Sequence, residues 1–149
     1  MREPIWITRD AAEAIHHEQL RAHGGRWGIR DENMLESALA RPRQKWAYEG
    51  DADLSDLAAA YGFGIAKNHP FIDGNKRTAF MTLFSFLYAN GVHLQASEPE
   101  AVTVMLGVAS GELAEPELAA WCRQRGESVS ACLRPGRGSR ARARAFSPP

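Results

Sequence analysis

The sequence has little cysteine and no long hydrophobic run. Its two cysteines, Cys122 and Cys132, match no zinc-ligand spacing and suit free thiols in a reducing compartment. No stretch is long and apolar enough to cross a bilayer, and residues 1–6 lack the apolar core of a signal peptide. With 149 residues, 44% of them hydrophobic, the chain can bury a core without a structural metal or disulfide. We therefore expect a cytoplasmic protein that makes no contact with a membrane.

Acidic residues are absent after Glu127. The five arginines beyond it are Arg134, Arg137, Arg140, Arg142 and Arg144, so residues 1–127 keep 13 of the 18 Lys and Arg and all 18 Asp and Glu. The body is therefore acidic by five charges and the tail basic by five. A cationic end can bind nucleic acid. The composition of residues 128–149 favours a solvated, disordered tail over that alternative.

Helical periodicity is plentiful in the rest of the chain. Helix caps, apolar stripes and glycine or proline stops predict six helices, over residues 8–23, 31 to about 42, 55–68, 75–89, 98–110 and 115–125. Thr8 and Ser97 are expected N-caps, and Pro42 is expected to end or bend the second helix. Residues 44–54, which contain Trp46 and Tyr48 among acids and a glycine, are expected to form a surface loop.

Short connections between amphipathic helices predict an all-α fold. Alternating strand patterns are scarce and no internal repeat is present. The helix over 75–89 is apolar on more than one face, which is typical of a central helix that others surround. We predict a compact single-domain helical bundle around this helix, formed by residues 1–127.

Residues 67–77 gather the groups that carry chemistry. Gly74 and Asn75 lead into the first turn of the apolar helix, where unpaired N–H groups and the positive end of the helix dipole attract phosphate. Gly74 permits a close backbone approach or a positive φ. Lys76 and Arg77 are mildly unfavourable at a helix start, by roughly 0.3–1 kcal/mol each, and a phosphate ligand would remove this conflict.

Three further residues of this loop suit phosphoryl transfer. Asp73 can hold magnesium together with substrate phosphates, His69 can take a proton from a hydroxyl group, and Phe71 is expected to bury itself and anchor the loop. Taken singly, the polar residues of the loop each have an ordinary structural explanation. His69 can cap a helix, Asp73-Gly74 can form a turn, and Lys76-Arg77 can belong to a solvated face. On the residues alone, the two interpretations remain balanced.

The run His69-Pro-Phe-Ile-Asp-Gly-Asn-Lys-Arg77 resembles the signature of the Fic/Doc family, and specifically its death-on-curing (Doc) branch. The likeness extends over about residues 4–125, through Ile29-Arg30-Asp31, the run 35–42, the run 58–61, and Asn75 to Ala79. The resemblance implies the helical Fic/Doc fold. It also implies a toxin of a type II toxin–antitoxin system, which modifies a protein with ATP and Mg²⁺.

Two positions depart from the broader Fic pattern, whose members typically transfer AMP from ATP to hydroxyl side chains. Lys76 replaces a glycine of the anion hole and Phe80 replaces an arginine that grips the outer phosphates. The Doc branch carries the same lysine and is associated with a reversed nucleotide. The resemblance therefore implies transfer of the γ-phosphoryl group, with translation elongation factor Tu as the target and arrest of translation as the result.

The resemblance also assigns roles to residues. His69 would be the general base, Asp73 would hold magnesium, and Gly74, Asn75, Lys76 and Arg77 would bind phosphates, with Lys67 adding charge toward the nucleotide. The loop from Trp46 to Asp53 would be the flap that holds the target. A self-inhibitory Ser/Thr-x-x-x-Glu motif is missing, so a cognate antitoxin is expected, seated in the cleft beside the first two helices.

Three alternatives remain. The first is AMP transfer by the same site, with Lys76 rearranged. The second is a catalytically idle helical domain tethered to nucleic acid by the arginine tail. The third is a metal hydrolase using His16, His17 and His23, although no His-Glu-x-x-His spacing is present.

Overall fold

The computed structural model describes residues 1–129, which fold into six helices and one pair of short strands. The elements are α1 (Arg9–His23), α2 (Glu32–Tyr48), α3 (Leu54–Asn68), α4 (Asn75–Ala89), β1 (Val92–Leu94), α5 (Glu98–Ser110), α6 (Glu115–Arg125) and β2 (Gly126–Ser128). The all-α prediction is confirmed. Residues 130–149, which include Cys132 and the five arginines of the predicted tail, lie outside the described residues. β2 reaches Ser128, the first residue assigned to that tail.

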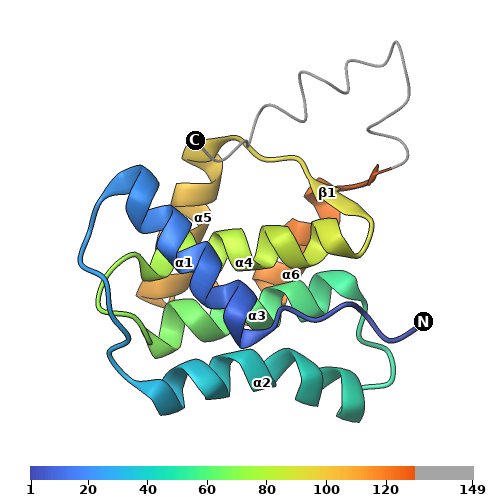
Figure 1. Ribbon diagram of the computed structural model, residues 1–149. Coiled ribbons are helices and arrows are strands. Elements are labelled where there is room, and N and C mark those ends of the chain that lie inside the picture. Colours follow the sequence, from blue (N-terminus) through green and yellow to red (C-terminus); the bar gives the residue numbers. More distant parts are fainter. Residues whose placement is uncertain (130–149) are drawn as a thin grey trace.

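α4 lies at the centre of the bundle, as its sequence predicts. Figure 1 shows α1 crossing in front of it, α3 beside it and α2 on the outer edge, and α4 packs against α1, α3, α5 and β1. Leu83, Phe86 and Leu87 of α4 are fully buried, as are Ala58, Ala59 and Ala60 of α3. The two helices approach closely at Gly62 of α3, where an added Cβ would stand 2.9 Å from Leu83 Cδ1. Burial of this many apolar side chains is the main source of stability here.

Local capping explains where most helices begin and end. Thr8 accepts a hydrogen bond from the Ala11 N–H at the start of α1, and Ser97 does the same for the Glu100 N–H of α5, as expected. α3 begins one residue earlier than predicted, because Asp53 and Asp56 form a reciprocal capping box. The predicted bounds of α4, α5 and α6 are confirmed.

Of the two outcomes expected at Pro42, an end or a bend of α2, the end is wrong, and so is the loop expected from residue 44. α2 continues as a helix to Tyr48, with Pro42 buried in its interior. Contacts beyond the proline hold this last part: Trp46 packs edge-on against Trp6 with ring centroids 6.1 Å apart, and Lys45 pairs with Glu115 of α6 at 3.3 Å. This packing outweighs the local cost of proline in a helix.

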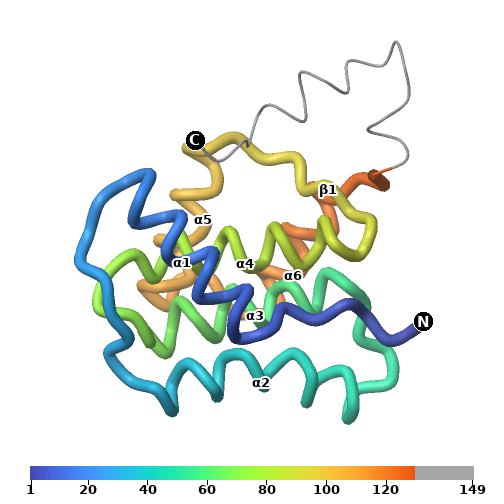
Figure 2. The backbone as a smooth tube through the Cα atoms, in the orientation of Figure 1, coloured from blue at the N-terminus to red at the C-terminus, as the bar shows by residue number. Residues whose placement is uncertain are grey.

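The two strands were not expected. β1 and β2 pair antiparallel, with His93 opposite Glu127, and the Val129 N–H donates to the Gly91 carbonyl at 2.9 Å. The tube in Figure 2 follows this return of the chain from α6 to the loop after α4. Cys122 of α6 is a free thiol, and burial raises its pKa to about 12. Within residues 1–129, no helix is both long and apolar enough to cross a membrane.

Candidate functional site

The chain turns sharply between α3 and α4. α3 ends at Asn68 because His69 adopts the left-handed conformation, with φ 54° and ψ 51°, and Pro70 follows. Gly74 leads into α4 from the same region, with φ 75°. This conformation costs a non-glycine residue roughly 1–2 kcal/mol, whereas glycine has no Cβ to oppose it. The positive φ considered for Gly74 is confirmed, and the strain of the turn falls on His69.

Phe71 anchors the turn in the core, as the sequence predicted. Its ring is fully buried, and the His16 ring of α1 stacks on it with centroids 3.8 Å apart. The backbone of Phe71 is held as well. Its N–H donates to Asn75 Oδ1 at 2.9 Å, and its carbonyl accepts from Asn75 Nδ2 at 2.9 Å.

Asn75 connects this anchor to His69. It is buried, and its Nδ2 lies 3.1 Å from His69 Nδ1. The two bonds with Phe71 fix which end of the amide is nitrogen, so Asn75 donates and His69 Nδ1 accepts. The neutral imidazole therefore carries its proton on Nε2. Both amide hydrogens of Asn75 are engaged, so only its backbone N–H remains for the predicted phosphate contact.

Asp73 is held through its backbone by His16. The His16 Nε2–H donates to the Asp73 carbonyl at 2.9 Å, and burial lowers the His16 pKa, which this hydrogen bond opposes only in part. His16 is thus a neutral side chain that ties α1 to the loop. The Asp73 carboxylate accepts from the Arg26 N–H at 3.1 Å through Oδ2. Because the residue is exposed, its other oxygen remains accessible, as a metal ligand requires.

The N-terminus of α4 differs from the other helix starts in the described part of the chain. It has no side-chain cap and no acidic residue in its first turn, whereas each of the other helices has acidic residues there. The first intrahelical bond runs from the Thr78 N–H to the Gly74 carbonyl, so the three preceding N–H groups are left for a ligand. Lys76 and Arg77 are exposed, and neither has an ion-pair partner among residues 1–129.

Lys67 lies in the last turn of α3, two residues before His69. Its side chain is exposed, and its Nζ is 3.7 Å from where a Cβ on Gly111 would stand. The ammonium group is therefore turned toward the end of α5. A cation is favourable at a helix C-terminus, so the position has a structural explanation of its own. The predicted contact with nucleotide remains a prediction.

Residues 24–31 form a part of the site that the sequence analysis missed. Gly28 accepts a hydrogen bond from the Ile72 N–H at 3.0 Å, and Ile29 bridges to Phe71. Gly24, Gly25 and Gly28 all have positive φ, and a Cβ on Gly28 would stand 2.6 Å from Ile72 Cδ1. Three glycines within five residues were the available signal, but they indicated only a helix stop.

Residues 46–53, the expected flap, do not lie beside the motif loop. Trp46 belongs to α2 and packs on Trp6, and the remaining loop leads into the N-terminus of α3. His69 follows the opposite end of that helix, and 15 residues at 1.5 Å each separate the two by roughly 20 Å. The segment that lies against the motif loop is residues 24–31.

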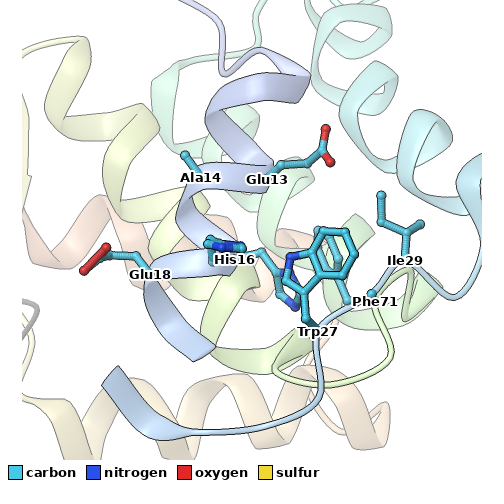
Figure 3. A pocket seen from close by; sticks show the side chains of 9 residues that line it. Glu13, Ala14, His16, Glu18, Trp27, Ile29 and Phe71 are labelled. Carbon is cyan, nitrogen blue, oxygen red and sulfur yellow. The ribbon is translucent and has the colours of Figure 1, made fainter. Parts of the chain in front are cut away.

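A pocket of about 430 Å³ adjoins this segment (Figure 3). Its walls are α1 and residues 27–29, with Phe71 at its edge, and Trp27 lines it while remaining 63% exposed. His17 meets Trp27 edge-on, whereas His16 is committed to Phe71 and Asp73. Within residues 1–129, no group of three or more His, Cys, Asp or Glu side chains could hold a metal ion, so the hydrolase alternative lacks a ligand set.

Comparison with known proteins places these residues in context. The model of the Fic/DOC family matches residues 6–87, a range that includes both residues 24–31 and the motif loop. The chain is 34% identical over 113 residues to the protein kinase doc of Escherichia phage P1, covering 76% of this chain and 89% of that protein. It is 47% identical over 77 residues to the toxin Doc of Mycolicibacterium smegmatis, covering 50% of this chain and 58% of the relative.

Proposed function

Because the chain belongs to the Fic/DOC family, we propose that it is a toxin that transfers the γ-phosphoryl group of ATP to a hydroxyl side chain of a protein. Elongation factor Tu is the proposed target, and arrest of translation is the proposed outcome. The names of the two relatives support a toxin and a protein kinase. The observation in this chain that carries the proposal is the N-terminus of α4, which has no side-chain cap and whose first N–H groups and two cations find no partner among residues 1–129.

The start of α4 fits a phosphate chain. The N–H groups of Asn75, Lys76 and Arg77 together with the helix dipole attract negative charge, and the two side chains add two fixed positive charges. Asp73, beside them, would hold Mg²⁺ together with the phosphates, and the ion would supply charge neutralisation for the transfer. Phosphoryl transfer depends mainly on such positioning and electrostatics.

His69 is the proposed base. The hydroxyl proton passes to the imidazole, the hydroxyl oxygen bonds to the γ-phosphorus, and the bond to the β,γ-bridging oxygen breaks to release ADP. Acceptance at Nε2 requires the tautomer with hydrogen on Nδ1, and that tautomer cannot accept from Asn75. We propose that the ring gives up its hydrogen bond with Asn75 when the target hydroxyl is bound, while the backbone of His69 keeps its left-handed conformation and so keeps the ring within reach of the hydroxyl.

Phe80 supports phosphoryl transfer over AMP transfer. It is 3% exposed and packs edge-on against Trp121, with ring centroids 6.3 Å apart. A side chain committed to the core cannot grip an outer phosphate as the arginine of the AMP-transferring pattern does. Lys76, which stands where that pattern has glycine, is exposed in the first turn of α4.

An antitoxin is the proposed regulator. The pocket between α1 and residues 27–29 lies beside the motif loop and exposes the ring of Trp27. An apolar side chain of a partner that covered this ring would also contact the segment that holds Ile72 in place. The pocket is therefore our proposed seat for the antitoxin.

The proposal is tested by incubating the protein with elongation factor Tu, Mg²⁺ and ATP labelled at either the α- or the γ-phosphate. We expect the γ label alone on the target, and none with His69→Ala. Asp73→Asn, which keeps an acceptor for the Arg26 N–H, should raise the Mg²⁺ concentration needed for transfer. Transfer of the α label would replace the proposal with AMP transfer, and transfer of neither label would refute this target.

A further inference from the structure

The C-terminal end of α3 is held by one guanidinium group. Arg30 Nε donates to the His69 carbonyl at 2.7 Å, and Arg30 Nη2 donates to the Asn68 carbonyl at 2.9 Å. The last carbonyls of a helix lack intrahelical partners, and the helix dipole makes this end negative. Arginine matches the site because its planar fork presents two donors at a fixed spacing together with a positive charge.

Backbone N–H groups of the same segment also bind the turn. The N–H groups of Arg30 and Asp31 both donate to the Pro70 carbonyl, at 2.7 and 3.1 Å. Three successive carbonyls, those of residues 68, 69 and 70, therefore accept hydrogen bonds from residues 30–31. On the far side, Asn68 Nδ2 donates to the Met34 carbonyl at 3.0 Å.

This arrangement explains how His69 stays in a conformation that it would otherwise leave. Its φ of 54° makes it the one non-glycine residue with positive φ among residues 1–129. Such a residue persists only where its surroundings over-determine it. Asn75 holds the ring but cannot hold the backbone, whereas Arg30 binds the carbonyl of the strained residue itself. No carboxylate within residues 1–129 pairs with Arg30, so these carbonyls are its partners.

We propose that Arg30 is a positioning residue for His69. Its guanidinium fixes the left-handed turn, and the turn delivers the imidazole to Asn75 beside the N-terminus of α4. The expected effect of Arg30 on the transfer rate rests on the proposed function, but its expected effect on the position of the His69 ring does not. Without the fork, His69 relaxes toward ordinary helical or extended backbone and its ring leaves Asn75.

The chain offers a matched control. Arg41 of α2 also makes a polar contact across the fold, with its Nε 2.8 Å from Glu115 Oε1 of α6, but it is outside the site. Arg41→Ala therefore reports the general effect of losing an arginine contact. Arg30→Lys keeps the positive charge and the aliphatic part of the side chain but lacks the planar guanidinium group. It is the test variant if Arg30→Ala fails to fold.

The primary readout is the ¹⁵N NMR spectrum of the neutral His69 ring, assigned by its loss in His69→Ala. In the unaltered protein we expect one tautomer, with a protonated Nε2 and a bare Nδ1. In Arg30→Ala, or in Arg30→Lys, the ¹⁵N chemical shifts of Nδ1 and Nε2 should converge toward those of a free imidazole. In Arg41→Ala, the two shifts should stay as they are in the unaltered protein. Unchanged shifts in a folded Arg30 variant, or equal convergence in Arg41→Ala, would overturn the proposal.

Kinetics supply the second readout. Arg30→Ala should lower kcat for γ-phosphoryl transfer about 100-fold, the size expected for a misplaced reacting group, and leave KM for ATP within about twofold. A rise in KM at constant kcat would overturn the positioning role. If the unaltered protein transfers no label at all, the proposed function fails on its own, and the ring spectra still decide whether Arg30 positions His69.

Discussion

At the scale of single residues, the site joins strain to function at His69. The residue that we propose as the base occupies a backbone conformation that costs an L-residue roughly 1–2 kcal/mol. Glycine would be the better choice for stability alone. The hydrogen bonds from Arg30 and Asn75 keep the strained residue in place. Strain of this kind, held by its surroundings, is typical of functional sites.

His69→Gly and His69→Ala separate the backbone from the ring. Both variants lack the imidazole and should lose transfer. His69→Gly should be more stable than His69→Ala by about 1 kcal/mol, because only alanine carries the left-handed penalty, reduced by the larger entropy that glycine loses on folding. Urea unfolding measures the difference.

Gly74→Ala is the reciprocal control for this prediction. At φ 75° its new Cβ would meet Leu20 Cδ2 at 3.4 Å, an ordinary contact, so the substitution adds backbone strain with little crowding. It should destabilise the protein by about 1 kcal/mol. Equal stability of the two His69 variants would show that the turn at residue 69 stores no strain.

At the scale of elements, helix caps and apolar periodicity were sufficient to predict the helix boundaries that local interactions determine. Thr8 and Ser97 begin their helices by bonding to N–H groups three residues away, and such signals are visible in the sequence. Pro42 is a local signal that failed, because contacts of Trp46 with Trp6 and of Lys45 with α6 hold the helix beyond it. The three-residue strands β1 and β2 are too short to produce an alternating pattern.

The same distinction applies to the site. The motif over residues 69–77 is contiguous, so its residue types could be identified together, and the structure brings His69 and Asn75 into contact. The part supplied by Arg30 could not be found this way. The run Ile29-Arg30-Asp31 forms part of the family resemblance, but the contacts of Arg30 with the carbonyls of Asn68 and His69 span 38 and 39 residues of sequence, and no local pattern indicates them.

Two lysines at opposite helix ends provide the prediction at this scale. Lys76 lies in the first turn of α4, where the dipole opposes a cation, and Lys67 lies in the last turn of α3, where it favours one. Lys76→Gln should raise the unfolding free energy by about 0.3–1 kcal/mol, and Lys67→Gln should lower it by a similar amount.

Urea titrations at low and high salt test this pair. Both shifts should shrink as salt screens the exposed charges. Lys76→Gln should also weaken ATP binding while it stabilises the protein, which would show that the unfavourable cation is kept for a ligand. Shifts of the same sign in both variants would mean that the helix ends do not govern these charges.

At the scale of the whole molecule, the core and the site share residues. Phe71 is at once the anchor of the motif loop and a fully buried core side chain, and His16 stacks on it from α1. At the other end of α4, His93 of β1 is buried between Phe84 and Tyr88, with ring centroids 5.6 and 5.7 Å away. One buried imidazole therefore helps to hold α1 against the motif loop that leads into α4, and the other helps to hold the strand pair against α4 itself.

These two histidines make stability depend on pH. Burial lowers the pKa of both, opposed for His16 by its bond to the Asp73 carbonyl and for His93 by the charge of Glu127. In the unfolded chain each titrates near its ordinary pKa of about 6.5 and binds a proton that the folded protein resists. The unfolded state thus holds more protons below about pH 6.5, and the unfolding free energy falls as the pH drops through that value. It levels off only once the pH is below the lowered pKa of the folded state.

Urea unfolding at a series of pH values between about 7.5 and 5.5 measures this slope. The unaltered protein should lose stability across the window. His16→Gln and His93→Gln should each reduce the slope, whatever their effect on stability at pH 7.5, and the double variant should be nearly flat. The exposed His23→Gln is the matched control and should keep the full slope. A double variant as steep as the unaltered protein would assign the pH dependence to other groups, and would mean that neither imidazole must stay neutral for the bundle to close around α4.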